Sequence, residues 1–132
     1  MNPERTERTE ALMLSILVVD DADTCRNMVD PFGDLGYVVD AADGGDTALE
    51  KAGQRPYDQG LLDLRMTGMD GLTLCRHLRR LRLLMVTMIL TAYGASSLAE
   101  EARDAGARHL LPKPIDFPKL LALVEQALPC TN

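Results

Sequence analysis

The stretch 61-LLDLRMTGMDG-71 decides the fold prediction. An apolar run ends there in one carboxylate, Asp63, and then breaks into a loop with two glycines. An aspartate often does no more than open a turn. At the end of a buried parallel strand, however, a carboxylate faces the crevice where such sheets place nucleophiles and ligands. The residues at the ends of the other strands decide between these two interpretations.

The composition is that of one soluble globular domain. The chain has 132 residues, of which 46% are hydrophobic and 26% are charged, enough for a single core. Its formal net charge of −6 disfavours binding to the phosphate backbone of nucleic acids. No apolar stretch is long enough to span a membrane. We therefore expect a cytoplasmic protein without a direct nucleic-acid or membrane partner.

The three cysteines are odd in number, widely spaced and without His or Cys neighbours at metal spacings. They are typical of reduced thiols in a cytosolic protein, and we expect Cys25 and Cys75 to be small core residues. The basic run 75–82 is interpreted as the solvated face of a helix rather than a nucleic-acid patch.

Short apolar runs alternate with amphipathic segments along the chain. We expect a mobile tail at residues 1–12 and one domain at 13–132. The expected strands are 15–19, 37–41, 59–63, 86–90 and 107–111. Helical spacing of apolar residues predicts helices around 25–32, 45–52, 74–81, 98–105 and 120–128. Pro31 is expected to kink the first helix or end it early.

This alternation predicts an α/β fold, a doubly wound five-stranded parallel sheet with helices on both faces. Its crossovers should be right-handed. In the strand order 2-1-3-4-5 the first and third strands are central neighbours. The functional site then lies beyond the carboxyl ends of the strands.

Groups suited to phosphoryl chemistry stand at four of the strand ends. They are Asp20 and Asp21 after the first strand, Asp63 at the end of the third, Thr91 after the fourth and Lys113 after the fifth. Three carboxylates in one crevice repel one another unless a cation joins them. We therefore expect Mg²⁺, or Mn²⁺ in its place. Asp63 is then the nucleophile toward phosphorus, and Lys113 and Thr91 bind phosphoryl oxygens.

These motifs resemble the receiver domain of two-component response regulators. The matching stretches are ILVVDDADTCRNMV, LLDLRMTGMDG, ILTAYGA and GARHLLPKPID, in that family's order and spacing over residues 15–128. The resemblance implies a flavodoxin-like receiver fold with Asp63 as the phosphoacceptor. It also implies that Asp20, Asp21, Asp63 and the backbone carbonyl of Arg65 hold the metal ion.

The resemblance further implies the partners. A sensor histidine kinase or a phosphotransfer protein supplies the phosphoryl group, and an unidentified target protein reads it. Thr91 and Lys113 relay the arrival of the phosphoryl group, and the peptide bond before Pro114 is often cis in this family. A weak homodimer through the fourth helix, fifth strand and fifth helix is known in the family.

Two positions depart from the family pattern. Thr67 stands where Pro is usual, and Leu110 stands where a Tyr or Phe usually turns inward when the threonine moves. Leu110, Tyr93 and Ala92 are therefore the expected switch and output positions. We expect output through the last two helices and the fifth strand without an aromatic switch.

The predicted function is a phosphorylation-dependent signalling switch, either a stand-alone receiver or a phosphorelay intermediate, and not a classical enzyme. No output module is expected after residue 128. One alternative is a degenerate receiver that binds its partner regardless of phosphorylation, which Leu110 keeps open. The other is a haloacid-dehalogenase-type phosphatase, which needs a second acid where this chain has Arg65.

Overall fold

The computed structural model describes residues 14–66, 68–81, 85–92 and 98–126. The expected tail, Thr67, Tyr93 and the third cysteine, Cys130, lie outside these ranges. The strands of the described residues are β1 (Ser15–Val19), β2 (Val38–Ala42), β3 (Gln59–Asp63), β4 (Val86–Thr91) and β5 (Ala107–Pro112). The helices are α2 (Ala22–Asp34), α3 (Gly45–Gln54), α4 (Gly71–Leu81), α5 (Ala99–Ala105) and α6 (Phe117–Gln126).

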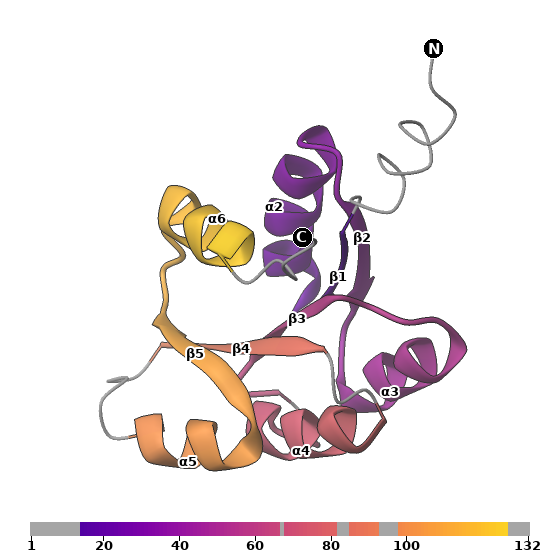
Figure 1. The fold of residues 1–132 in the computed structure, drawn as a ribbon, viewed down its shortest axis with the longest axis vertical. Coiled ribbons are helices and arrows are strands. Elements are labelled where there is room, and N and C mark those ends of the chain that lie inside the picture. Colours follow the sequence, from indigo (N-terminus) through magenta and orange to yellow (C-terminus); the bar gives the residue numbers. More distant parts are fainter. Residues whose placement is uncertain (1–13, 67, 82–84, 93–97, 127–132) are drawn as a thin grey trace.

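The strands form one parallel sheet in the order β2-β1-β3-β4-β5, which confirms the predicted topology. Helices α2 and α6 cover one face of this sheet, and α3, α4 and α5 cover the other (Figure 1). Four of the expected strands begin where they were predicted, whereas β2 lies one residue later than 37–41. The α/β doubly wound fold is therefore confirmed.

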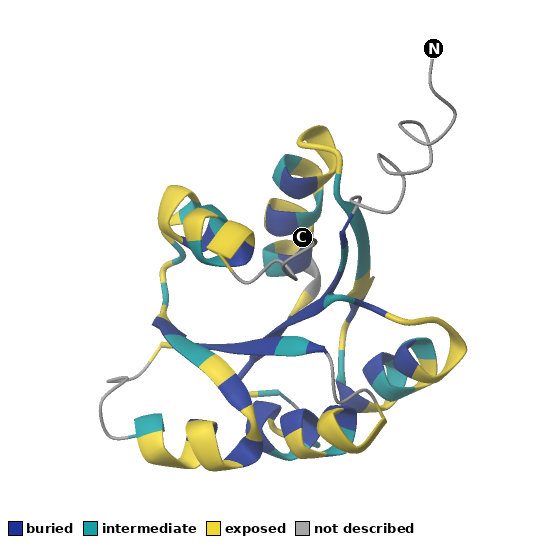
Figure 2. Ribbon diagram, in the orientation of Figure 1, coloured by how far each residue is buried: buried dark blue, intermediate teal, exposed yellow. Residues whose placement is uncertain are grey.

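Alternation along the strands builds two cores, one on each face of the sheet. In β1, Ile16 and Val18 join the core under α2 and α6, while Leu17 and Val19 join the core under α3, α4 and α5. This is the two-residue period of a strand covered on both faces. Buried positions accordingly run along the sheet and the inner sides of the helices (Figure 2). Cys25 and Cys75 are buried free thiols, as expected.

Pro31 and Leu81 lie near the carboxyl ends of their helices. Pro31 does not end the first helix early, because α2 continues to Asp34, and the alternative of a kink stays a prediction. Phe32 is fully buried and packs against Phe117 and Tyr37 at ring distances of 4.8 and 5.6 Å, and this packing offsets the hydrogen bond that Pro31 cannot donate. Leu81 follows Leu74 and Leu78 in the apolar spacing of its helix and is 46% exposed, because it is the last residue of α4.

In the part of the chain that the structure describes, the helices are too short or too polar to cross a bilayer.

Candidate functional site

The sheet brings Asp20, Asp63 and Lys113 together at the carboxyl ends of its strands. Asp20 follows β1, whose Val19 is paired with Leu62 of β3, so Asp20 and Asp63 end neighbouring strands. Lys113 follows β5, two strands away from β3. Its ammonium nitrogen lies 2.8 Å from Oδ2 of Asp20 and 3.0 Å from Oδ1 of Asp63. One cation therefore serves two carboxylates at the end of the sheet.

Asp20 is the most enclosed acid of this group, with no exposed surface. Its Oδ1 accepts a hydrogen bond from the Asp21 backbone N–H at 2.7 Å. Its Oδ2 is buried and is paired with the Lys113 ammonium group at 2.8 Å. Burial raises the pKa of Asp20, and the hydrogen bond and charge of Lys113 offset this only in part. The site holds a carboxylate that water cannot solvate.

Lys113 shows the matching effect on its own ionisation. Burial lowers the pKa of its ammonium group, but the hydrogen bonds and charges of Asp20 and Asp63 more than compensate, so its pKa is raised. Lys113 is therefore held as a cation in a half-buried position.

Asp21 also has a structural part at the start of α2. It is the N-cap of α2, and its Oδ1 accepts a hydrogen bond from the Thr24 backbone N–H at 2.9 Å. That bond lowers the pKa of the exposed Asp21 carboxyl. Among the described residues, no three Asp, Glu, His or Cys side chains gather closely enough to enclose a metal ion. Asp21 therefore caps α2 in this structure, and its expected role as a metal ligand stays a prediction.

The remaining acids still fit a hard divalent cation. Mg²⁺ is usually held by one or two carboxylates and keeps several waters. Asp20 and Asp63 supply two carboxylates at one point, where the Lys113 ammonium group pairs with both. This donor set consists of oxygens alone, which is the ligand type that Mg²⁺ and Mn²⁺ prefer.

The loop after Asp63 is fixed by two close backbone approaches. A Cβ on Gly71 would lie 2.4 Å from the carbonyl oxygen of Asp63, so this position tolerates only glycine. The Gly71 N–H also donates to the Leu64 carbonyl at 2.8 Å. Within the same loop, Gly68 has a φ of +85°, a left-handed conformation that favours glycine. The residue pattern alone does not reveal that Gly71 packs directly against the backbone of Asp63.

Arg65 and Met69 leave this loop in different directions. The Arg65 side chain is exposed two residues after Asp63. Met69 packs on Gly45 at the start of α3, where an added Cβ would lie 2.7 Å from the Met69 sulfur. Helix α3 therefore anchors the far side of the loop.

Thr91 and Lys113 are tied to each other through the backbone. Thr91 is buried at the end of β4, and its carbonyl accepts a hydrogen bond from the Lys113 N–H at 2.7 Å. The Lys113–Pro114 peptide bond is cis. Ala92, directly after Thr91, is exposed.

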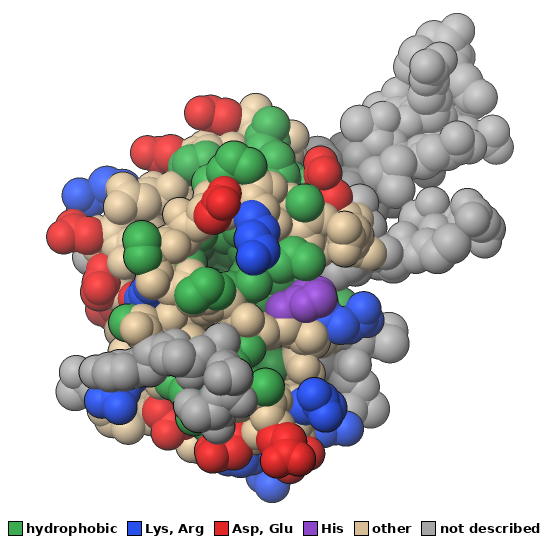
Figure 3. Space-filling model, turned by 90° about the vertical axis from the view of Figure 1, so that its left-hand side faces the viewer, with side chains coloured by type: hydrophobic (Ala, Val, Ile, Leu, Met, Phe, Trp, Pro, Cys, Tyr) green, Lys and Arg blue, Asp and Glu red, His purple; other side chains and the backbone are tan. Residues whose placement is uncertain are grey.

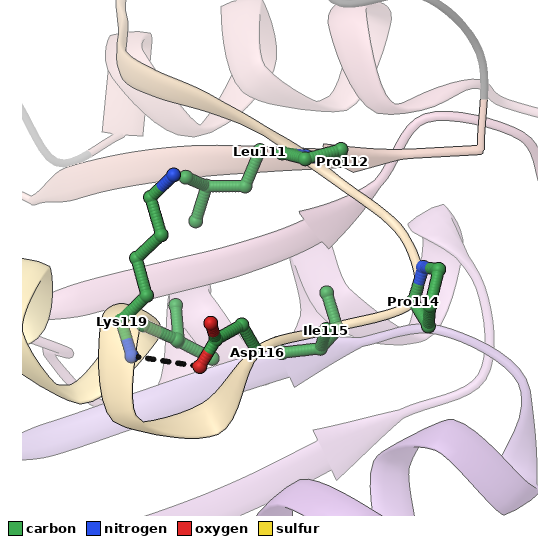
Figure 4. A pocket seen from close by; sticks show the side chains of 7 residues that line it. Leu111, Pro112, Pro114, Ile115, Asp116 and Lys119 are labelled. Carbon is green, nitrogen blue, oxygen red and sulfur yellow. Dashed lines mark hydrogen bonds between the residues drawn. The ribbon is translucent and has the colours of Figure 1, made fainter.

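The turn after Lys113 leads into α6 and borders a small cavity. Oδ1 of Asp116 accepts a hydrogen bond from the Lys119 N–H at 3.2 Å, and this bond caps the helix (Figure 4). The cavity of about 210 Å³ lies between this turn and β5, beside Leu111 and Pro114. It therefore adjoins the site through the Lys113–Pro114 bond.

Leu110 is half-buried on β5 and packs against the core under α3, α4 and α5. It therefore occupies the inner side of the strand with an aliphatic side chain. Burial, followed by the charge of Arg108, lowers the pKa of the adjacent His109.

Comparison with known proteins places these features in context. The sequence pattern of the response regulator receiver domain matches residues 16–125. The chain is 37% identical over 120 residues to the transcriptional regulatory protein ZraR of Escherichia coli K12, covering 90% of this chain and 27% of ZraR. It thus spans about a quarter of the length of that relative.

Solved structures of similar shape agree. The chemotaxis protein CheY4 of Vibrio cholerae has a TM-score of 0.83 and 26% identity, covering 88% of this chain and 99% of CheY4. The response regulator TrrA of Thermotoga maritima, solved in complex with Mg(2+)-BeF, has a TM-score of 0.78 and 30% identity, covering 88% of this chain and all of TrrA (100%).

Proposed function

Because this chain belongs to the response regulator receiver domain family, we propose that it is a phosphorylation-dependent signalling switch whose phosphoacceptor is Asp63. The observation that carries the proposal is the placement of Lys113, 3.0 Å from Asp63 and 2.8 Å from Asp20. A fixed cation beside a carboxylate nucleophile is what phosphoryl transfer requires, since the protein contributes mainly positioning and charge stabilisation.

The proposed reaction begins with a phosphohistidine on a sensor kinase or phosphotransfer protein. A carboxylate oxygen of Asp63 attacks the phosphorus, an O–P bond forms, and the N–P bond breaks with its electron pair returning to the imidazole. Lys113 pairs with a phosphoryl oxygen, and the Thr91 hydroxyl donates a hydrogen bond to another. Water later hydrolyses the acyl phosphate. Because Asp63 is itself modified, the chain acts as a self-catalysing switch rather than a classical enzyme.

We propose that Asp20, Asp21, Asp63 and the Arg65 carbonyl hold Mg²⁺, which Mn²⁺ can replace. The bound cation supplies neutralisation of charge on the phosphoryl oxygens. The oxygen-only donor set and the buried Oδ2 of Asp20 support this assignment, as does the Mg(2+)-BeF bound to TrrA. Asp21 already gives one oxygen to the cap of α2, so we expect it to be the weakest contributor.

The partners follow from the same chemistry. We propose that this chain is cytoplasmic, with a sensor histidine kinase or phosphotransfer protein as donor and a separate protein as target. ZraR is by name a transcriptional regulatory protein, whereas the net charge of −6 on this chain disfavours direct contact with DNA phosphates.

Output is proposed to pass through β5, α5 and α6 without an aromatic switch. Residue 110 is a leucine, so this position has no aromatic ring to turn inward. Its side chain already packs on the core. Backbone NMR with and without beryllofluoride and Mg²⁺ tests this. Shifts at residues 107–113 in the wild type, absent in Asp63→Asn, support the proposal. Unchanged resonances at residues 92 and 107–113 would overturn it.

A further inference from the structure

A second polar cavity lies at the opposite edge of the sheet from Asp63. It has a volume of about 560 Å³ and is bordered by the first residues of β4 and β5, Val86 and Ala107. Because the strands are parallel, Asp63 and Lys113 stand at the other ends of the same strands. The cavity is therefore separate from the proposed phosphorylation site.

Three arginines from three different elements line this cavity. Arg79 comes from α4, Arg103 from α5 and Arg108 from β5. No Asp or Glu is among the described residues that line it. On the face shown in Figure 3, some of the Lys and Arg side chains lie at the right, beside and below the purple histidine, with Asp and Glu side chains beneath them. This local excess of positive charge contrasts with the net charge of −6 on the whole chain.

Arg79 lies against Gly106, another residue that lines the cavity. Gly106 has a φ of +104°, and a Cβ at that position would lie 2.8 Å from Cδ of Arg79. The Arg79 Nη1 donates a long hydrogen bond of 3.5 Å to the backbone carbonyl of Asp104, so this contact leaves the Arg79 charge without a carboxylate partner. In the described part of the chain, neither Arg103 nor Arg108 forms an ion pair.

The helix dipoles account for only part of this cluster. Arginines in the last turns of α4 and α5 stabilise the negative ends of those helices. That explains Arg79 and Arg103 but not Arg108, which belongs to a strand. The charge of Arg108 is also felt by its neighbour, since burial and then Arg108 lower the pKa of His109. The three arginines are exposed and form no ion pair with a described carboxylate, so they make this hollow favourable for an anion.

We propose that this cavity binds a small phosphorylated anion carrying a diphosphate group, with the guanidinium groups of Arg79, Arg103 and Arg108 as its ligands. The planar fork of a guanidinium matches phosphate oxygens bidentately. Three such groups suit more than one phosphate. A hollow of this volume is in the range of small-ligand sites rather than of flat protein interfaces. The apolar side chains of Met85 and Val86 border it and can contact the organic part of the ligand.

The test uses pyrophosphate as the probe, in Mg²⁺-free buffer of low ionic strength, followed by amide NMR of the whole chain. The proposal predicts saturable shifts at residues 85–87 and 103–109, with inorganic phosphate binding more weakly. Arg108→Gln should weaken binding about tenfold. Arg108→Lys keeps the positive charge but loses the planar guanidinium group. Its affinity for pyrophosphate should lie between those of the wild type and Arg108→Gln. Arg80→Gln, the same charge change one residue beyond Arg79 and outside the cavity, should leave binding unchanged.

Three results would overturn the proposal. The first is an absence of saturable shifts at these residues. The second is equal weakening by Arg80→Gln and Arg108→Gln, which would show only diffuse attraction to a basic surface. The third is tighter binding of a short oligoglutamate peptide than of pyrophosphate, which would assign the surface to an acidic protein segment. Because Arg108 is exposed, matching thermal unfolding curves for its variants separate loss of binding from loss of fold.

Discussion

The ammonium nitrogen of Lys113 lies 3.0 Å from Oδ1 of Asp63, although β4 separates the strands that carry these two residues. The same nitrogen lies 2.8 Å from Oδ2 of Asp20. Lys113 therefore bridges the carboxyl ends of β1 and β3 from the far side of β4. Its replacement should affect both carboxylates at once.

Lys113→Gln should slow phosphorylation of Asp63 by acetyl phosphate roughly 100-fold, because the fixed charge beside the phosphoryl oxygens is lost. Intact-mass time courses measure this rate. Lys119→Gln on α6 removes the same charge from an exposed position and is the matched control. Equal rates for Lys113→Gln and the wild type would show that Lys113 is only a structural ion-pair partner.

Asp20→Asn should stabilise the fold at pH 7 by about 1 kcal/mol, or roughly 4 °C in Tm, while weakening Mg²⁺ binding. The folded-state pKa of Asp20 is raised, chiefly by burial, so the folded chain retains this proton more readily than the unfolded chain. The free-energy cost of burying the ionised Asp20 carboxylate is absent well below the unfolded pKa of about 3.8. This cost grows as pH rises through the pKa of the folded chain.

Urea unfolding at pH 7 and near pH 4 measures the pH dependence of stability for the wild type and Asp20→Asn. Titration calorimetry measures the Mg²⁺ affinity of both proteins. The stability gain of Asp20→Asn should shrink toward the lower pH. A variant less stable than the wild type at pH 7 would mean that the Lys113 ion pair outweighs the cost of burial.

Gly71→Ala should destabilise the chain by about 2 kcal/mol and impair phosphorylation, because its Cβ would overlap the Asp63 carbonyl oxygen. Gly53→Ala in α3 is the control, since an added Cβ there meets no atom within 4 Å. It should be neutral or stabilising by about 0.5 kcal/mol. Chemical denaturation and the mass assay together measure both effects, and an unimpaired Gly71→Ala would contradict the packing described for this loop.

Tyr57→Phe should cost about 1 kcal/mol at neutral pH, because the Tyr57 hydroxyl donates a 2.6 Å hydrogen bond to Asp40. Burial, followed by this bond, raises the pKa of Tyr57 to about 12 from a usual 10.0. The contribution is complete below pH 10 and is lost as pH rises toward 12, since the unfolded chain ionises first. Unfolding free energies of both proteins across this range provide the check, and a difference independent of pH would refute the assignment.

The strands and their order could be predicted from the sequence, because each buried run carries a strong apolar signal bounded by turn residues. Asp20, Asp63 and Lys113 could be placed together for the same reason: topology alone brings the carboxyl ends of parallel strands to one edge. Their meeting at hydrogen-bonding distance follows from that topology.

Other features depend on contacts between distant residues. The tolerance of α2 for Pro31 comes from the packing of Phe32 on Phe117, which residue spacing does not reveal. Asp21 serves both as a strand-end acid and as a helix cap, and only the structure shows that the cap directs its carboxylate. The cavity lined by three arginines joins three elements, and the basic run at 75–82 contains only one of these arginines, Arg79.

The most direct test of the central claim is the intact mass of the chain after incubation with acetyl phosphate and Mg²⁺, for the wild type and for Asp63→Asn. The account predicts one phosphate adduct on the wild type, none without Mg²⁺ and none on Asp63→Asn. An adduct of equal yield on Asp63→Asn, or none on a wild type that is folded and supplied with Mg²⁺, would contradict it.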